Sequence, residues 1–124
     1  IPGNVTGQSL LSHFTQEKPS FRPITCGNIG SIYGATDGRY KYCWHSDEGH
    51  ELLFDQDTDP RDCRDLADDR EHQPHLQRLR QHLIEWMTRH GDARVENGRL
   101  KVVPLDHKLE QRYRRNNWNN RGWR

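Results

Sequence analysis

The residues best suited to chemistry in this 124-residue sequence are three cysteines, eight histidines and a run of aspartates. Cys26, Cys43 and Cys63 include no Cys-x-x-Cys pair, which excludes a four-cysteine zinc site. An isolated cysteine is more often a small apolar residue than a nucleophile. The sequence has no Gly-x-Ser-x-Gly turn and no phosphate-binding glycine loop. We therefore predict no catalytic residue in this chain.

The aspartates imitate the opening of a calcium-binding loop. Asp55, Asp57 and Asp59 have its spacing, but that loop requires Gly at its sixth position and Glu at its twelfth. Pro60 and Leu66 stand at those positions. An Asp-rich turn is therefore the better interpretation.

The histidines are a second set of candidate metal ligands. His72, His75 and His82 are spaced so that pairs of them could share one face of a helix. However, no His-Glu-x-x-His arrangement and no cysteine pair completes a ligand set. We predict no metal ion or cofactor in this chain, and a histidine site is the minor alternative.

The C-terminal residues form a basic tail rich in amides and aromatic rings. Residues 108–124 hold six basic residues and one acidic residue, Glu110. Guanidinium groups bind anionic oxygens with two parallel donors, and tryptophan can stack on a sugar. Trp118, Arg121 and Trp123 are therefore the candidate substrate-binding residues. In the alternative interpretation, these tryptophans simply anchor the tail to the body of the protein.

Composition limits the class of protein. Hydrophobic residues make up 31% of the sequence, and no apolar run approaches the roughly 18 residues that a membrane span requires. The 19 basic and 18 acidic residues give a net charge of +1, which argues against a fully disordered chain. Residues 47–71 nevertheless hold eleven acidic residues and three arginines. We expect one small domain that does not enter a membrane.

The pattern of apolar residues predicts the elements that position these side chains. Four segments have the β-branched and aromatic residues of strands, with glycine-containing turns between them: Ile24–Cys26, Ser31–Thr36, Arg39–His45 and Glu51–Phe54. Pro74 suits the first turn of a helix that ends near Gly91. Its apolar residues recur at spacings of three and four: Leu76, Leu79, Leu83 and Met87. Asn97-Gly98 then predicts a tight hairpin.

Together these elements predict an α+β fold. It is a small antiparallel sheet of about four strands packed by one long C-terminal helix, followed by a hairpin and a polar tail. The single domain, residues 1–124, divides into four parts: a lead-in segment (1–20), a sheet-plus-helix core (21–91), a hairpin (92–104) and the basic tail (105–124).

The order of these pieces resembles the C-terminal part of the sulfatase family (arylsulfatase-type sulfuric ester hydrolases). The similar pieces are a strand at Asp37–Tyr42, a second strand at Glu51–Asp55, an Asp-Pro turn at Asp59-Pro60, and Asp65-Leu66-Ala67 before the helix at His72–Arg89. Upstream, Gly7-Gln8-Ser9-Leu10-Leu11 is similar to the family's Gly-x-Ser-Leu-Leu step. The resemblance covers roughly residues 6 to 90.

The resemblance implies a parent enzyme that hydrolyses sulfate esters with calcium and a formylglycine. That formylglycine is made from the Cys of a Cys-x-Pro/Ala-x-Arg segment in a larger N-terminal catalytic domain. None of the three cysteines here lies in such a segment. The chain, which opens Ile1-Pro2-Gly3 without Met, is therefore expected to be an inactive C-terminal accessory domain whose partner is that catalytic domain.

Two other interpretations remain open. Related phosphonate or phosphate ester hydrolases share this kind of ending, and a stand-alone module could bind nucleic acid or an anionic glycan through the tail. Nucleic acid is disfavoured, because no folded nucleic-acid-binding motif accompanies the tail. We also expect the sheet face that bears Tyr40, Tyr42 and Trp44, or the opposite face, to be exposed or self-associated in the isolated chain. The sequence leaves the cellular compartment open.

Overall fold

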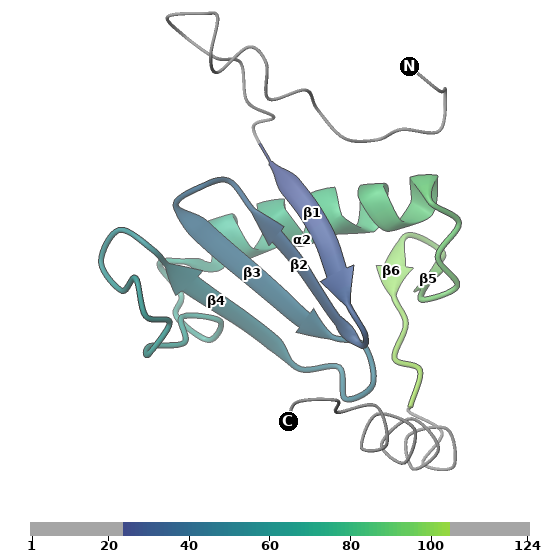
Figure 1. Cartoon of the computed structure of the whole chain (residues 1–124), viewed down its shortest axis with the longest axis horizontal. Helices are drawn as coiled ribbons and strands as arrows, with labels where there is room; N and C mark the ends of the chain where they lie inside the picture. Colours follow the sequence, from purple (N-terminus) through teal and green to yellow (C-terminus); the bar gives the residue numbers. More distant parts are fainter. Residues whose placement is uncertain (1–23, 105–124) are drawn as a thin grey trace, which may run out of the picture.

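The computed structural model describes residues 24–104, which form one sheet, one helix and a small hairpin (Figure 1). The four-stranded antiparallel sheet has the order β1-β2-β3-β4, and its strands are β1 (Thr25–Ile29), β2 (Ile32–Thr36), β3 (Tyr40–His45) and β4 (Glu51–Asp55). Helix α2 (Gln73–Arg89) lies across one face of this sheet. The hairpin of β5 (Val95–Glu96) and β6 (Arg99–Leu100) follows the helix. The predicted α+β architecture is confirmed.

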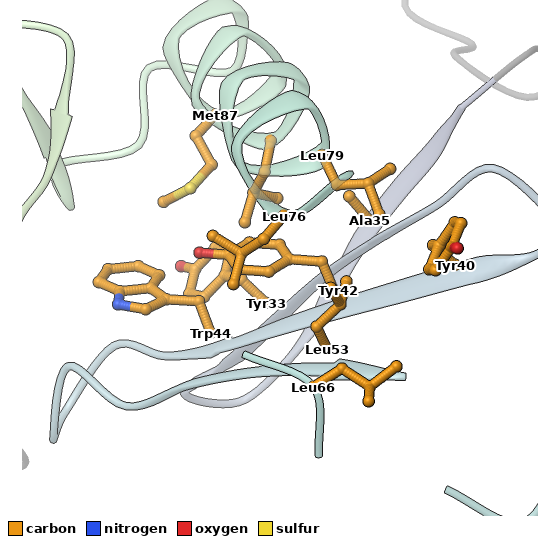
Figure 2. Packing of buried hydrophobic residues seen from close by; sticks show 11 residues of the cluster. Tyr33, Ala35, Tyr40, Tyr42, Trp44, Leu53, Leu66, Leu76, Leu79 and Met87 are labelled. Carbon is orange, nitrogen blue, oxygen red and sulfur yellow. The ribbon is translucent and has the colours of Figure 1, made fainter. Parts of the chain in front are cut away.

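Alternation along the strands gives the sheet one aromatic face. Tyr40, Tyr42 and Trp44 of β3 are buried toward α2, whereas the residues between them point to the outer face. Tyr33 lies opposite Trp44 in the β2–β3 register, and Ala35 lies opposite Tyr42, so β2 extends the same layer. Figure 2 shows Tyr33, Tyr42 and Trp44 gathered beneath the helix, with Tyr40 farther along the sheet.

The helix covers this layer with its apolar stripe. The stripe residues are no more than 2% exposed: Leu76, Leu79, Leu83 and Met87. Pro74 lies in the first turn, as predicted, where its missing N–H leaves no helical hydrogen bond unmade. Gly91 follows the C-cap with a φ of +65°, a conformation that glycine adopts without strain. The predicted orientation of the helix is confirmed.

The first hairpin differs from the prediction. Strand β1 runs to Ile29 instead of ending at Cys26, because the turn is made by Gly30 and Ser31. Gly30 supplies the positive φ (+60°) that a two-residue hairpin loop needs. Gly27 and Asn28, whose types are typical of turns, instead lie inside the strand. Fold context therefore overrides residue preference here.

The second hairpin follows the prediction but is shorter. Asn97 (φ 52°) and Gly98 (φ 71°) form its tight turn, as the Asn-Gly pair indicates. Beyond β6 the chain passes the β3–β4 turn, where the Val103 N–H donates to the Ser46 carbonyl at 2.8 Å. The predicted lead-in segment and basic tail lie outside the described residues, so the domain division remains a prediction.

Replacement of Leu83 by Asp tests the helix–sheet interface. Leu83 is fully buried, so a carboxylate there would lose its hydration without gaining a partner. We expect a loss of roughly 3–5 kcal/mol in the free energy of unfolding, measured by urea denaturation. Gln77→Asp, at an exposed position of the same helix, is the matched control. Equal stability of the two variants would contradict the assigned helix face.

Candidate functional site

The predicted substrate-binding residues are not among the described ones. Trp118, Arg121 and Trp123 lie outside residues 24–104, so their role remains a prediction. The described residues offer three other places where function could reside. These are the polar groups at the helix–sheet interface, the acidic segment after β4, and two hollows of the surface.

A buried tyrosine connects the sheet to the helix. The Tyr42 hydroxyl donates to a carboxylate oxygen of Glu51, and the Arg80 guanidinium donates to both oxygens of that carboxylate at 2.6 Å. Burial, together with the Glu51 hydrogen bond, raises the pKa of Tyr42. Tyr42 therefore stays protonated and acts as a hydrogen-bond donor.

A second tyrosine holds the turn that follows the helix. The Tyr33 hydroxyl donates to Asp92 Oδ2 at 2.7 Å and accepts from Arg94 Nη1 at 3.1 Å. This network joins β2 to the segment before β5. Its partners are about 60 residues apart in the sequence, and no local motif links them.

A cleft of about 500 Å³ opens between α2 and the β5–β6 hairpin. Its walls include the apolar side chains of Ile84 and Leu100, and its polar lining includes Arg80 and Arg99. Arg80 is already paired with Glu51, so Arg99 is the cation better placed for a ligand. The cleft could bind an anionic group, but its lining holds no paired nucleophile and base.

The acidic segment forms ion pairs. Arg39 donates from Nε and Nη2 to the two oxygens of Asp55 at 3.1 and 2.9 Å, and the Asp57 N–H donates to the same carboxylate at 3.2 Å. These bonds, above all those from Arg39, lower the pKa of Asp55 to about 2. The segment is thus a turn held by an arginine, in agreement with the interpretation of Asp55, Asp57 and Asp59 as an Asp-rich turn.

The histidines at the start of α2 pack on an aromatic ring. His75 stacks on Tyr40 with ring centroids 4.0 Å apart, and His72 meets the same ring edge-on at 6.1 Å. The structure thus brings these two histidines together, whereas His82 lies near Glu85 farther along the helix. Within residues 24–104, no three His, Cys, Asp or Glu side chains are grouped to hold a metal ion.

Two of the three cysteines are in environments that disfavour the thiolate. Cys26 and Cys43 are half-buried, and burial raises the pKa of both thiols. Cys63 is exposed in the loop after β4, and its sulfur lies 3.7 Å from the Arg61 carbonyl oxygen. Neither Cys26 nor Cys43 is therefore arranged as an activated nucleophile.

The outer face of the sheet, opposite α2, carries exposed apolar side chains. Ile29 is 87% exposed and Ile32 is 42% exposed, and the two residues lie directly opposite each other in the β1–β2 register. Beside them, Gly27 and Gly34 are also paired and form the floor of a trough of about 510 Å³. The helix covers the aromatic face only, so apolar surface remains on the opposite one.

Comparison with solved structures identifies this fold as that of part of a sulfatase. One match is a protein from Bacteroides thetaiotaomicron VPI-5482 provisionally classed as a sulfatase, and another is a 2-O GAG sulfatase. Each has a TM-score of 0.64 and 24% sequence identity over 86% of this chain. The chain spans 24% of the length of either structure. The resemblance to sulfatases is therefore confirmed for the fold.

Searches by sequence gave no further relative, since no family model and no curated protein matches the chain. Within the described part of the chain, no helix has the length and hydropathy needed to cross a membrane. The fold match is therefore the comparison on which a functional proposal can be based.

The Arg39–Asp55 pair predicts a pH dependence of stability. A folded pKa of about 2 lies below the unfolded value of about 3.9. The carboxylate therefore stabilises the fold above pH 4, and this contribution is lost as the pH falls toward 2. We expect thermal melts of Asp55→Asn to show less of this acid-induced loss than wild type. Asp57→Asn, at a more exposed carboxylate near Arg39, should behave like wild type.

Proposed function

We propose that this chain is the C-terminal accessory domain of a sulfatase, and that the parent enzyme hydrolyses sulfate esters. The observation that carries the proposal is the fold match, which takes in 86% of this chain but only 24% of each solved structure. In this proposal the remaining three-quarters of the parent contains the reaction centre. The chain itself has no catalytic activity.

The residues of this chain support the proposal that the reaction centre lies in the rest of the parent enzyme. Sulfatases require a formylglycine and calcium, and no cysteine of this chain lies in the Cys-x-Pro/Ala-x-Arg segment that gives rise to formylglycine. Among residues 24–104, carboxylates such as Asp55 and Glu51 are engaged by arginines. The residues of this chain therefore fit neither a formylglycine nor a calcium ion, so the formylglycine and the calcium site would both belong to the catalytic domain of the parent.

The partner in this proposal is that N-terminal catalytic domain. A domain that packs on a larger one needs to cover only one of its own faces, since the partner covers the other. The exposed Ile29 and Ile32 and the adjacent trough give the outer face the apolar surface that such packing would bury. In the isolated chain the same surface would favour self-association.

The substrate class we propose is an anionic glycan sulfate. One of the matched structures is a 2-O GAG sulfatase, which supports this choice. Arg121 would bind sulfate or carboxylate oxygens, while Trp118 and Trp123 would stack on sugar rings at the rim of the parent's cleft.

An assay with an aryl sulfate tests the inactivity of the chain. The purified 124-residue chain should show no turnover, with or without calcium, because the proposal assigns the reaction to residues outside it. The full-length parent, assayed in parallel, is the positive control. Turnover by the chain alone, at a rate that follows its concentration, would contradict the proposal.

Replacement of Arg121 by Ala in the full-length parent tests the tail. If Arg121 binds substrate, the KM for a glycan sulfate should rise about tenfold or more while the melting temperature stays unchanged. Arg112→Ala is the matched control, because this tail arginine is farther from Trp118 and Trp123 along the sequence. A lower melting temperature with unchanged kinetic constants would instead show that the tail anchors itself to the protein body.

A further inference from the structure

The outer edge of β1 offers backbone groups for pairing. The Ser46 N–H donates to the Ser31 carbonyl at 2.8 Å, so the odd-numbered residues of β2 bond toward β3. Bonding direction alternates along an antiparallel strand, so the even-numbered residues of β2 bond toward β1. In the β1–β2 register these are opposite Thr25, Gly27 and Ile29. The N–H and C=O groups of Cys26 and Asn28 therefore point away from the sheet.

The opposite edge of the sheet is satisfied within the chain. The Leu53 N–H of β4 donates to Asp65 Oδ1 at 3.0 Å, and the Leu53 carbonyl accepts from the Leu66 N–H at 2.8 Å. The Asp55 carbonyl accepts from the Asp59 N–H, also at 2.8 Å. None of the described residues does the same for β1. The outward backbone groups of β4 thus have partners within the described residues, whereas those of β1 do not.

Strand β1 also lacks the usual protection of an edge. Its sequence, Thr-Cys-Gly-Asn-Ile, contains no charged residue and no proline, and its pairing with β2 runs without a bulge. An edge strand that stays unpaired is commonly protected by a charged residue, a proline or a bulge. The composition of β1 is therefore that of a strand with a neighbour on both sides.

The outer face beside this edge is shaped for an apolar side chain. The paired Gly27 and Gly34 leave a trough of about 510 Å³ next to the exposed Ile29 and Ile32. The one charged residue of its lining, Lys41, is already paired with Asp62. The trough therefore favours an uncharged occupant.

We propose that β1 is paired in the parent enzyme with a strand from the larger domain, so that the four-stranded sheet becomes five-stranded. The added strand would pair with Cys26 and Asn28 and place an apolar or β-branched side chain over the Gly27–Gly34 trough. This inference rests on the proposed function, because the occupant belongs to the three-quarters of the matched sulfatases that this chain does not cover. Beyond the proposed function, it specifies that the larger domain contacts the β1 edge and that the contact is a pairing of strands.

Amide hydrogen exchange at single residues tests the proposal. In the 124-residue chain the amides of Cys26 and Asn28 should exchange quickly, and in the full-length parent at least about 100-fold more slowly. The Gly27 amide, which bonds to β2, should be protected in both proteins and serves as the internal reference. Fast exchange at Cys26 and Asn28 in the parent would overturn the proposal.

The same measurement identifies any other occupant. Protection in the isolated chain that is independent of concentration would assign the edge to the chain's own terminal segments. Protection that grows with concentration would assign it to a second copy. Either result would overturn the proposal. The proposed function fails separately, if the parent carries no sulfatase activity.

A pair of substitutions provides a second readout. Asn28→Pro removes an outward N–H without removing a bond to β2, whereas Asn28→Ala keeps the N–H. In the isolated chain the two variants should melt within a few degrees of each other. In the parent, only Asn28→Pro should accelerate proteolytic separation of the two domains, by about tenfold. Equal cleavage of both variants in the parent would contradict strand pairing at this edge.

Discussion

A single helix can cover only one face of a four-stranded sheet, and the rest of this structure depends on that constraint. The stripe of α2 buries the aromatic face formed by Tyr33, Tyr42 and Trp44. The chain has no second described helix to cover the outer face. The low hydrophobic content of the sequence, 31%, agrees with a core built on one side. One-sidedness is thus both the main stabilising feature and the reason to expect a partner.

The choice of aromatic residues has consequences of its own. Tyrosine buries a large apolar ring but carries a hydroxyl that must find a partner. Tyr42 reaches Glu51, which Arg80 holds from the helix, and Tyr33 reaches Asp92 in the turn that follows the helix. The polar networks therefore fix the position of α2 on the sheet along its length. They explain how a small layer of large rings can be specific in its packing.

The sequence predicts much of the fold because its signals are local. The stripe from Leu76 to Met87, the Asn97-Gly98 turn and the alternation in β3 each act over a few residues. The extent of β1 was not predictable in the same way, since Gly27 and Asn28 favour turns and adopt a strand only through pairing with β2. The hydrogen-bond networks of Tyr33 and Tyr42, and the difference between the β1 and β4 edges, could not be predicted from the sequence either. They join residues such as Tyr33 and Asp92 that are distant in sequence.

The central claim, that this chain is one domain of a larger sulfatase, is tested most directly by the coding sequence upstream of Ile1. If the claim holds, an open reading frame continues upstream for several hundred residues, because the chain spans only 24% of each matched structure. That frame should contain a Cys-x-Pro/Ala-x-Arg segment and the acidic residues of a calcium site. A reading frame that starts immediately before Ile1, or that joins it to a domain without this segment, would contradict the account.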